Sequence, residues 1–256
     1  MGVLRSRKFI LEKEVVDISN LQNKRVAIDM MIYIIGFYFS TKNNFFWHSK
    51  ILNFINFLVE NKITVTCVYD GNNKFKKKYV KQRNRKFPSY EEVSELNDLI
   101  LKTFKNKVKI LISDGEAESC CAFLLKDKKI DFVISDDSDL ILYDVDFIHI
   151  SCRYNKFDNK YVYELNLYKV KDYLQNEKLH LFCLLLGTDY TKSNPPFLVL
   201  ELLANNDLST VINYFNDIND NNFEYYMSNH FFPNGNFKFY KQQKNITYNI
   251  PLLKVY

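Results

Sequence analysis

The stretch Asp131-Phe-Val-Ile-Ser-Asp-Asp-Ser-Asp139 decides the fold of this 256-residue chain. A short β-branched and aromatic run passes directly into a cluster of aspartates. Three more runs have the same character: residues 24–29 (KRVAID), 63–71 (ITVTCVYDG) and 108–112 (VKILI). The first ends in aspartate, and the second ends in aspartate followed by glycine. Short apolar runs bounded by turn residues are typical of buried strands, so the sequence predicts four of them.

Helical patterns separate these strands. Residues 50–60, for example, place apolar side chains at 51, 52, 55, 58 and 59, which is a helical period. Helices are expected from residue 30 through 39 and at 50–60, 90–104, 116–125, 167–175 and 177–187. Strands that alternate with helices predict an α/β fold with a mostly parallel central sheet.

Composition excludes several classes of protein. The chain is 47% hydrophobic and 16% aromatic, too rich in buryable surface to be disordered. Its net charge of +5 permits a polyanionic partner without requiring one. Five cysteines without a C-x-x-C pair indicate a reduced, intracellular protein, and no apolar run reaches the ~20 residues that span a membrane.

No repeat is present. We expect a core over residues 1–190 and a dependent helical extension over 191–256 packed on it.

Acidic residues recur where the predicted strands end. They are Asp29, Asp70, Glu116, Glu118, Asp136, Asp137, Asp139 and Asp189. A single aspartate after a strand is usually a helix cap or a turn residue, and Asp136 fits that role. Gathered at one sheet edge, however, so many carboxylates would repel one another unless cations lay between them. Oxygen-only ligands favour Mg²⁺ or Mn²⁺, and paired ions ~4 Å apart are an apparatus for phosphodiester cleavage.

Five motifs carry a family resemblance: VAIDMMIYI, VYDGN, SDGEAESCCAFL, VISDDSDLILY and LLGTDY. In order and spacing, residues 1–190 resemble the flap endonuclease/XPG nuclease superfamily. The resemblance implies a PIN-like nuclease fold and two Mg²⁺ ions, with Mn²⁺ able to replace them. It assigns Asp29, Asp70, Glu116 and Glu118 to the first metal site, and Asp137, Asp139 and Asp189 to the second.

A basic segment follows the second strand, with eight cations between Lys74 and Lys86. Lys74, Lys78, Lys81 and Arg85 fall on one face of a helix, where they would hold phosphates. A solvated charged face or a nuclear-import patch is the structural alternative. The resemblance implies a gateway helix here, with Lys77 and Arg83 contacting the scissile phosphate. The short interval from Asp70 to Glu116 implies a shortened helical arch.

Three other positions are candidate nucleic-acid contacts. Relatives place Gly2 close to the active site. Phe46, in the Phe45–Trp47 triplet, lies where relatives have an apolar wedge, but the triplet could equally begin a buried helix. For Tyr33, the sequence leaves two roles open: stacking on a base or packing in the core. The sequence after Asp189 lacks the glycines of the family's helix-two-turn-helix, so a degenerate version is expected, and no clamp-binding motif is evident.

The sequence therefore predicts a metal-dependent, structure-specific DNA nuclease, a 5′ flap endonuclease or 5′–3′ exonuclease acting in replication, recombination or repair. Its partners would be branched, flapped or nicked DNA. An RNA-cleaving member of the superfamily is the first alternative, because the same metals cleave either backbone. A non-catalytic DNA-binding scaffold is the second. Small size and a Lys-, Asn- and Ile-rich composition favour a compact, AT-rich genome such as that of a virus, with action in the nucleus or at a cytoplasmic replication site.

Overall fold

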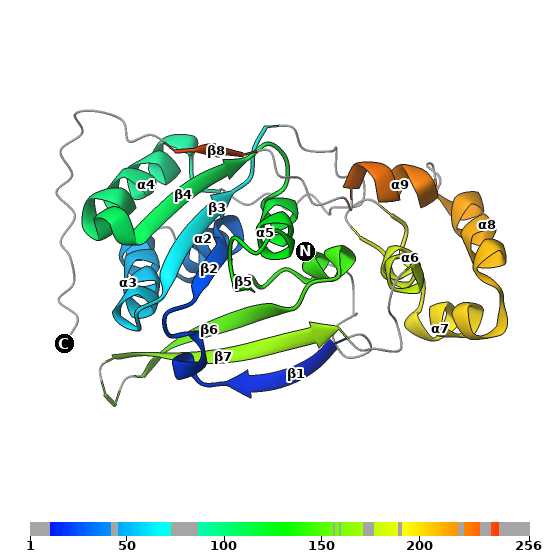
Figure 1. The fold of residues 1–256 in the computed structure, drawn as a ribbon, viewed down its shortest axis with the longest axis horizontal. Helices are drawn as coiled ribbons and strands as arrows, with labels where there is room; N and C mark the ends of the chain where they lie inside the picture. The colour runs from blue at the N-terminus through cyan, green and yellow to red at the C-terminus, as the bar shows by residue number, and fades with distance from the viewer. Residues whose placement is uncertain are drawn as a thin grey trace.

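A single mixed sheet organises the computed structural model (Figure 1). The structure describes residues 11–41, 46–72, 87–155, 157–158, 160–170, 177–188, 191–219, 223–230 and 237–240. The strands are β1 (Leu11–Val16), β2 (Arg25–Asp29), β3 (Thr64–Tyr69), β4 (Val108–Ser113), β5 (Phe132–Ile134), β6 (Phe147–Asn155), β7 (Lys160–Val170) and β8 (Phe237–Phe239). Their order is β1-β7-β6-β5-β2-β3-β4-β8. The five central strands are parallel and the outer ones antiparallel, which confirms the predicted α/β class.

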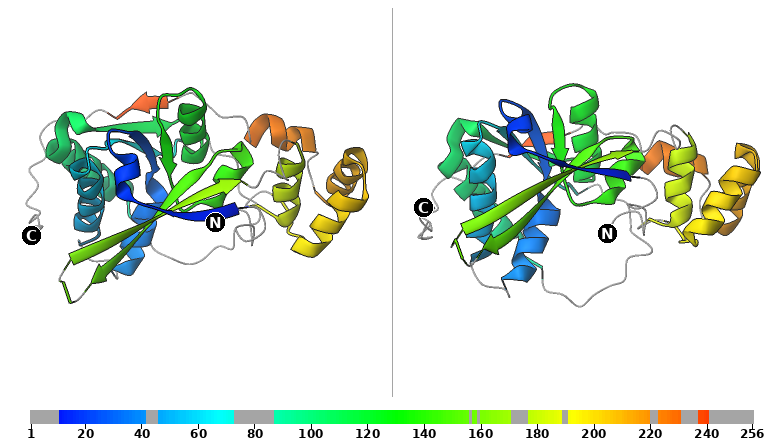
Figure 2. Two further views of the ribbon diagram at one scale, coloured as in Figure 1. Left: turned by 60° about the horizontal axis from the view of Figure 1, so that its bottom comes forward. Right: turned by 90° about the horizontal axis from the view of Figure 1, so that it is seen from below.

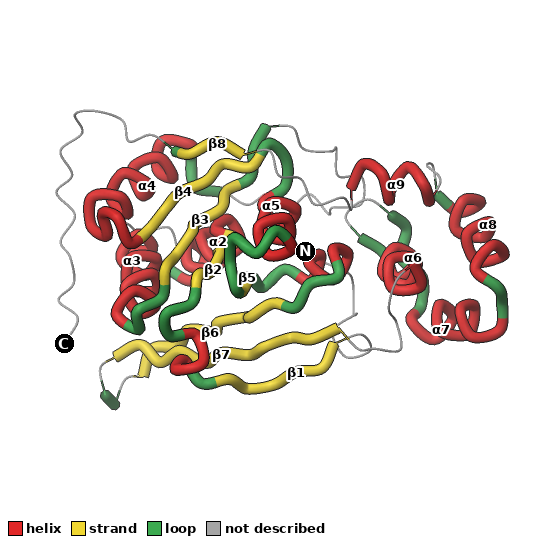
Figure 3. Tube along the Cα trace, viewed as in Figure 1, coloured by secondary structure: helices red, strands yellow, loops and turns green. Residues whose placement is uncertain are grey.

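Helices cover both faces of the sheet (Figure 3). They are α2 (Met30–Ser40), α3 (Phe46–Glu60), α4 (Tyr90–Phe104), α5 (Ala117–Lys126), α6 (Glu177–Leu186), α7 (Pro196–Asn205), α8 (Leu208–Ile218) and α9 (Phe223–His230), with 3₁₀ turns η1 (Ile18–Leu21), η2 (Lys105–Lys107) and η3 (Ser138–Tyr143). Along β2, Val26 and Ile28 join the core beneath α2, α3 and α4, while Ala27 joins the core beneath α5 and α6. Strand side chains alternate between faces, so this strand is buried on both.

One predicted helix is wrong. Residues 167–170 of the expected helix 167–175 belong to β7, and residues 171–175 lie outside the described part of the chain. β7 pairs along its length with β6 and through residues 165–170 with β1. The alternating, tyrosine-rich segment suits a pleated surface, and pairing to two neighbours outweighs its weak local helical pattern.

The last helices form a group at one end of the molecule (Figure 2). Val199, Val211 and Phe215 of α7 and α8 belong to the same buried cluster as α5 and α6. The chain then returns to the sheet as β8, which pairs with the outer side of β4. The hydroxyl of Tyr240, which follows β8, lies 3.1 Å from Asp98 Oδ1 on α4. Among the described helices, none has the length and apolar character required to cross a bilayer.

Candidate metal centre

Carboxylates from four different segments meet at the carboxyl edge of the parallel strands. Asp70, Glu116 and Glu118 each offer a ligand atom, and these atoms lie within 4.8 Å of one another. Asp29, at the end of β2, and Asp137, after β5, are also buried, being 3% and 7% exposed. The acidic edge expected from the sequence is therefore formed by residues far apart in the chain.

Backbone contacts bring β3 and α5 together at this edge. Asp70 accepts a hydrogen bond of 2.8 Å from the backbone N–H of Ala117, in the first turn of α5. The N–H of Gly71 donates to the carbonyl of Gly115 at 2.8 Å. A Cβ atom at Gly71 would overlap the carbonyl oxygen of Ser113. Glycine is needed here because two backbones approach closely, and that approach places Asp70 beside Glu116.

A buried serine, which sequence reasoning missed, joins two of the acidic segments. Ser135 Oγ donates to Asp29 Oδ2 at 3.0 Å and accepts from the N–H of Asp137 at 2.9 Å. Asp137 Oδ1 in turn accepts from the N–H of Asp139 at 3.0 Å, capping η3. The Ser135 hydroxyl thus fixes the end of β2 against the loop after β5.

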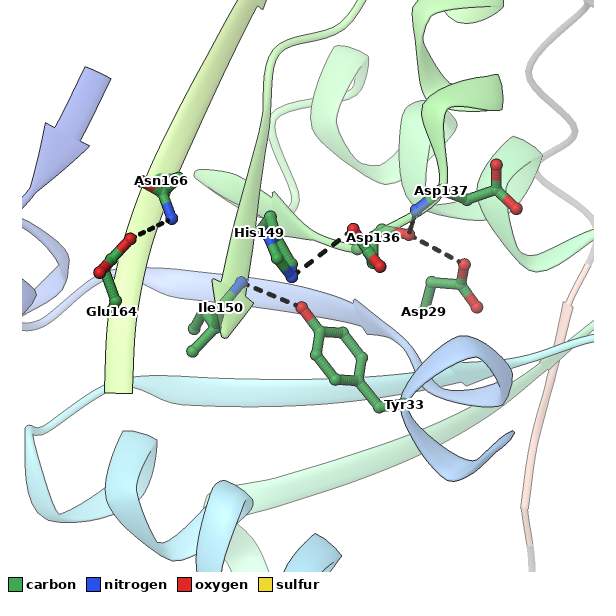
Figure 4. Close-up of polar contacts among 9 residues, drawn as sticks. Asp29, Tyr33, Asp136, Asp137, His149, Ile150, Glu164 and Asn166 are labelled. Atoms are coloured by element: carbon green, nitrogen blue, oxygen red, sulfur yellow. Dashed lines mark hydrogen bonds and ion pairs between the residues drawn. The ribbon is translucent and has the colours of Figure 1, made fainter. Parts of the chain in front are cut away.

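The neighbouring aspartate has a different role from the expected one. Asp137 supplies the cap of η3 that the sequence assigned to Asp136. The Asp136 carboxylate instead faces β6, where its Oδ1 lies 3.5 Å from Nε2 of His149 (Figure 4). Successive side chains of this extended segment point to opposite sides, so one aspartate faces the metal centre and the other the hairpin.

The electrostatics of the cluster favour a cation. Burial, assisted by the charges of Asp70 and Asp137, raises the pKa of Asp29 to about 8, although the Ser135 hydrogen bond opposes the rise. Burial and the neighbouring carboxylates raise the pKa of Glu118 well above its ordinary value. Among the described residues, Glu118 Oε2 has no hydrogen-bond partner although it is buried. Such hard oxygen donors, short of positive charge, fit Mg²⁺ or Mn²⁺.

We expect Ser135→Ala to raise the Mg²⁺ concentration needed for half-maximal cleavage by about 10-fold to 100-fold, because groups that orient metal ligands typically have effects of this size. A magnesium titration of cleavage rate measures this shift. Ser94→Ala removes a buried hydroxyl that bonds Tyr240 and is the matched control. An unchanged magnesium requirement in Ser135→Ala would contradict the bridging role.

Several sequence candidates lie outside the described residues: Gly2, Lys74, Lys77, Lys78, Lys81, Arg83, Arg85 and Asp189. Phe46 begins α3 with 59% of its surface exposed, while Trp47 beside it is buried. Tyr33 is 7% exposed and stacks on Phe54 with ring centroids 4.8 Å apart. Its hydroxyl accepts from the N–H of Ile150 at 3.2 Å. Between the two roles left open for Tyr33, the contacts favour the core.

This combination defines a class: a PIN-like nuclease fold with a cluster of carboxylates at its carboxyl edge. The XPG I-region family model matches residues 107–189. The fold matches a Rad2 catalytic core in complex with DNA substrate (24% identity, TM-score 0.63, covering 80% of this chain and 68% of that one). It also matches flap endonuclease-1 from Methanococcus jannaschii (19%, 0.58, 88% and 82%) and human GEN1 in complex with Holliday junction DNA (18%, 0.57, 81% and 56%).

Identities this low establish a shared fold, and the XPG I-region match adds a sequence likeness over residues 107–189. Over residues 107–189 the chain is similar to the XPG I-region, and its fold is similar to those of Rad2 and flap endonuclease-1. A search of curated protein sequences gave no significant match. The chain spans about two thirds of the matched Rad2 core and 56% of the GEN1 chain.

Proposed function

We propose that this protein is a divalent-metal-dependent, structure-specific DNA nuclease that cleaves 5′-flapped, branched or nicked DNA during replication, recombination or repair. The observation that carries the proposal is the carboxylate cluster that Asp70 forms with Glu116 and Glu118 of the XPG I-region, on a nuclease fold. The Rad2 and GEN1 structures were determined with DNA, which supports DNA as the substrate class.

The carboxylates divide into two ligand sets. One ion would be held by Asp70, Glu116 and Glu118 together with Asp29. The second ion would be held by Asp137, Asp139 and Asp189. When bound, divalent ions lower the pKa of a water molecule and neutralise charge on the scissile phosphate and the leaving 3′ oxygen. The protein's own groups orient the ligands: Ser135 holds Asp29, and the N–H of Ala117 holds Asp70. The burial of Asp29 keeps competing water from its carboxylate.

Cations outside the cluster would grip the substrate. We propose that Lys77 and Arg83 contact the scissile phosphate, and that Lys74, Lys78, Lys81 and Arg85 hold the adjoining backbone. Phosphate contacts of this kind make binding steeply salt-dependent. Exposed Phe46 is available for stacking beside the duplex end.

The test uses a 5′-labelled double-flap DNA, a nicked duplex and a single-stranded RNA, each with Mg²⁺ or EDTA. We expect magnesium-dependent cutting at the flap junction, reduced by about 10³-fold or more in Asp137→Asn because a metal ligand is lost. Asp127→Asn, an exposed aspartate after α5, is the matched control. Cutting of RNA alone would replace the DNA nuclease with an RNA-cleaving enzyme, and no metal-dependent cutting of any substrate would leave a non-catalytic scaffold.

A further inference from the structure

Exposed lysines gather at the amino edge of the parallel strands, the edge opposite the carboxylate cluster. They lie on the turns that lead into β2, β3, β4 and β5, which are residues 22–25, 61–64, 105–107 and 127–131. These turns are neighbours because the strands pair in parallel (Figure 1). We call the following lysines the basic edge: Lys24, Lys62, Lys105, Lys107 and Lys128.

Three lysines of the basic edge hold a backbone conformation that favours glycine. The angle φ is +61° at Lys62, +49° at Lys105 and +55° at Lys128, just after the ends of α3, α4 and α5. After α3 and after α5 the chain closes in the Schellman arrangement, whose left-handed position is most often glycine. Asparagine tolerates this conformation better than lysine does, and Asn23 in the neighbouring turn has it too. Lysine is therefore present at three turns where glycine or asparagine would be less strained, and such outliers indicate a function for the side chain.

The positive charge of the basic edge is not balanced locally. The two aspartates on the same turns are already paired, Asp131 with Arg25 at 2.9 Å and Asp127 with Lys129 at 2.9 Å. Within the described part of the chain, no lysine of the basic edge forms an ion pair. Glu60 at the end of α3, and about half a negative charge at the carboxyl end of each helix, offset only part of this charge. The edge is therefore available to an anionic partner.

The residues of these turns indicate the class of partner. Every exposed residue on them is polar or charged, because their large apolar residues, Ile63 and Ile130, are buried. A protein partner typically requires an apolar patch at the centre of its interface, and single-stranded DNA requires aromatic rings on which its bases stack. Cations without apolar or aromatic neighbours suit the phosphates of a duplex, whose bases are already stacked.

We propose that the basic edge binds the phosphate backbone of a second DNA duplex, separate from the DNA at the metal centre. The choice of DNA over RNA rests on the proposed function. From Lys62 to Asp70, eight residues of mostly extended chain span about 26 Å, so no single phosphate contacts both edges. The protein thus holds its substrate at one edge of the sheet and a neighbouring duplex at the other.

The experiment is a capture assay in EDTA, where no cleavage occurs. Beads that carry flap DNA hold a limiting amount of protein, and a fluorescent blunt duplex is added, so fluorescence stays on the beads only where the protein holds both DNAs. We expect the wild type to retain the duplex. The triple variant Lys62→Asn, Lys105→Asn, Lys128→Asn should retain it with at least about tenfold lower affinity. The slope of log affinity against log salt should become shallower by about 3, at ~0.9 for each lost phosphate contact.

A second triple variant is the matched control: Lys13→Asn, Lys160→Asn, Lys192→Asn. It removes the same charge at exposed positions outside the basic edge and should retain the duplex as the wild type does. Asparagine suits a positive φ, so the basic-edge variant should melt no lower than the wild type. Thermal melting and binding to the flap beads check that both variants are folded.

Three results would overturn the proposal: a wild type that retains no duplex, a basic-edge variant that retains it equally well, or equal losses in both triple variants. Release of the duplex by poly-glutamate as readily as by unlabelled duplex would reassign the edge to an acidic protein segment. Because capture in EDTA is independent of catalysis, a protein that cuts flaps but retains no second duplex refutes the basic edge alone. A protein that retains the duplex but cuts no substrate refutes the nuclease function alone.

Discussion

Glu118→Gln is expected to lower magnesium-dependent cleavage by at least about 10³-fold and, at the same time, to stabilise the metal-free protein. Burial and four neighbouring carboxylates raise the pKa of Glu118, so the folded chain either holds an unfavourable charge or takes up a proton. Glutamine is neutral in the folded and unfolded states and avoids that cost. We expect the melting temperature in EDTA to rise by about 3–8 °C.

Two measurements on the same preparation check this prediction: flap cleavage across a magnesium titration, and thermal unfolding in EDTA. Glu201→Gln makes the same change at an exposed position on α7 and should alter neither quantity. A variant that keeps full activity would remove Glu118 from the metal centre. A fall in melting temperature would instead show that the glutamate stabilises the fold.

The second large effect concerns pH. In the metal-free protein the pKa of Asp29 is about 8, against an ordinary value of 3.8, so the folded state holds a proton that the unfolded state releases. Stability falls with rising pH whenever the folded state binds more protons. The contribution of Asp29 is therefore complete below about pH 4 and lost between pH 4 and 8. We expect the melting temperature in EDTA to fall by on the order of 10 °C across this window.

Magnesium should counteract this loss, because cations bind the ionised carboxylates and stabilise the folded state. The stabilisation by Mg²⁺ is thus expected to be small at pH 5 and large at pH 8, as measured by melting temperature with and without the ion. Asp29→Asn should flatten the pH dependence in EDTA. A wild-type protein whose melting temperature does not decline between pH 5 and 8 would falsify this account of Asp29.

The parallel part of the fold could be predicted because its signals are local. The runs that became β2, β3, β4 and β5 are short and apolar, and residues of β2 alternate between two cores as a doubly buried strand requires. β1 and β8 depend instead on partners distant in sequence, and so does the end of β7 that pairs with β1. Residues 167–170 show the consequence, since a helix was expected where pairing with β1 and β6 forms a strand.

The same division applies to the site. An aspartate at the end of an apolar run is visible in the sequence, so the carboxylates were expected at one edge. The roles of Ser135 and His149 were not, because the partner of a hydroxyl or an imidazole is set by the fold. Gly71 was interpreted only as the end of a strand, whereas its contact with the 113–115 loop aligns two ligand-bearing segments.

The return of the chain to the sheet has a mechanical consequence. Helices α6–α9 leave after β7, on one side of the sheet, and β8 rejoins on the far side at β4. These helices are therefore joined to the sheet at both of their ends. A single proteolytic nick between α7 and α8 would leave each fragment held by its own side of the sheet, so release of α8 and α9 would require a second cut before β8.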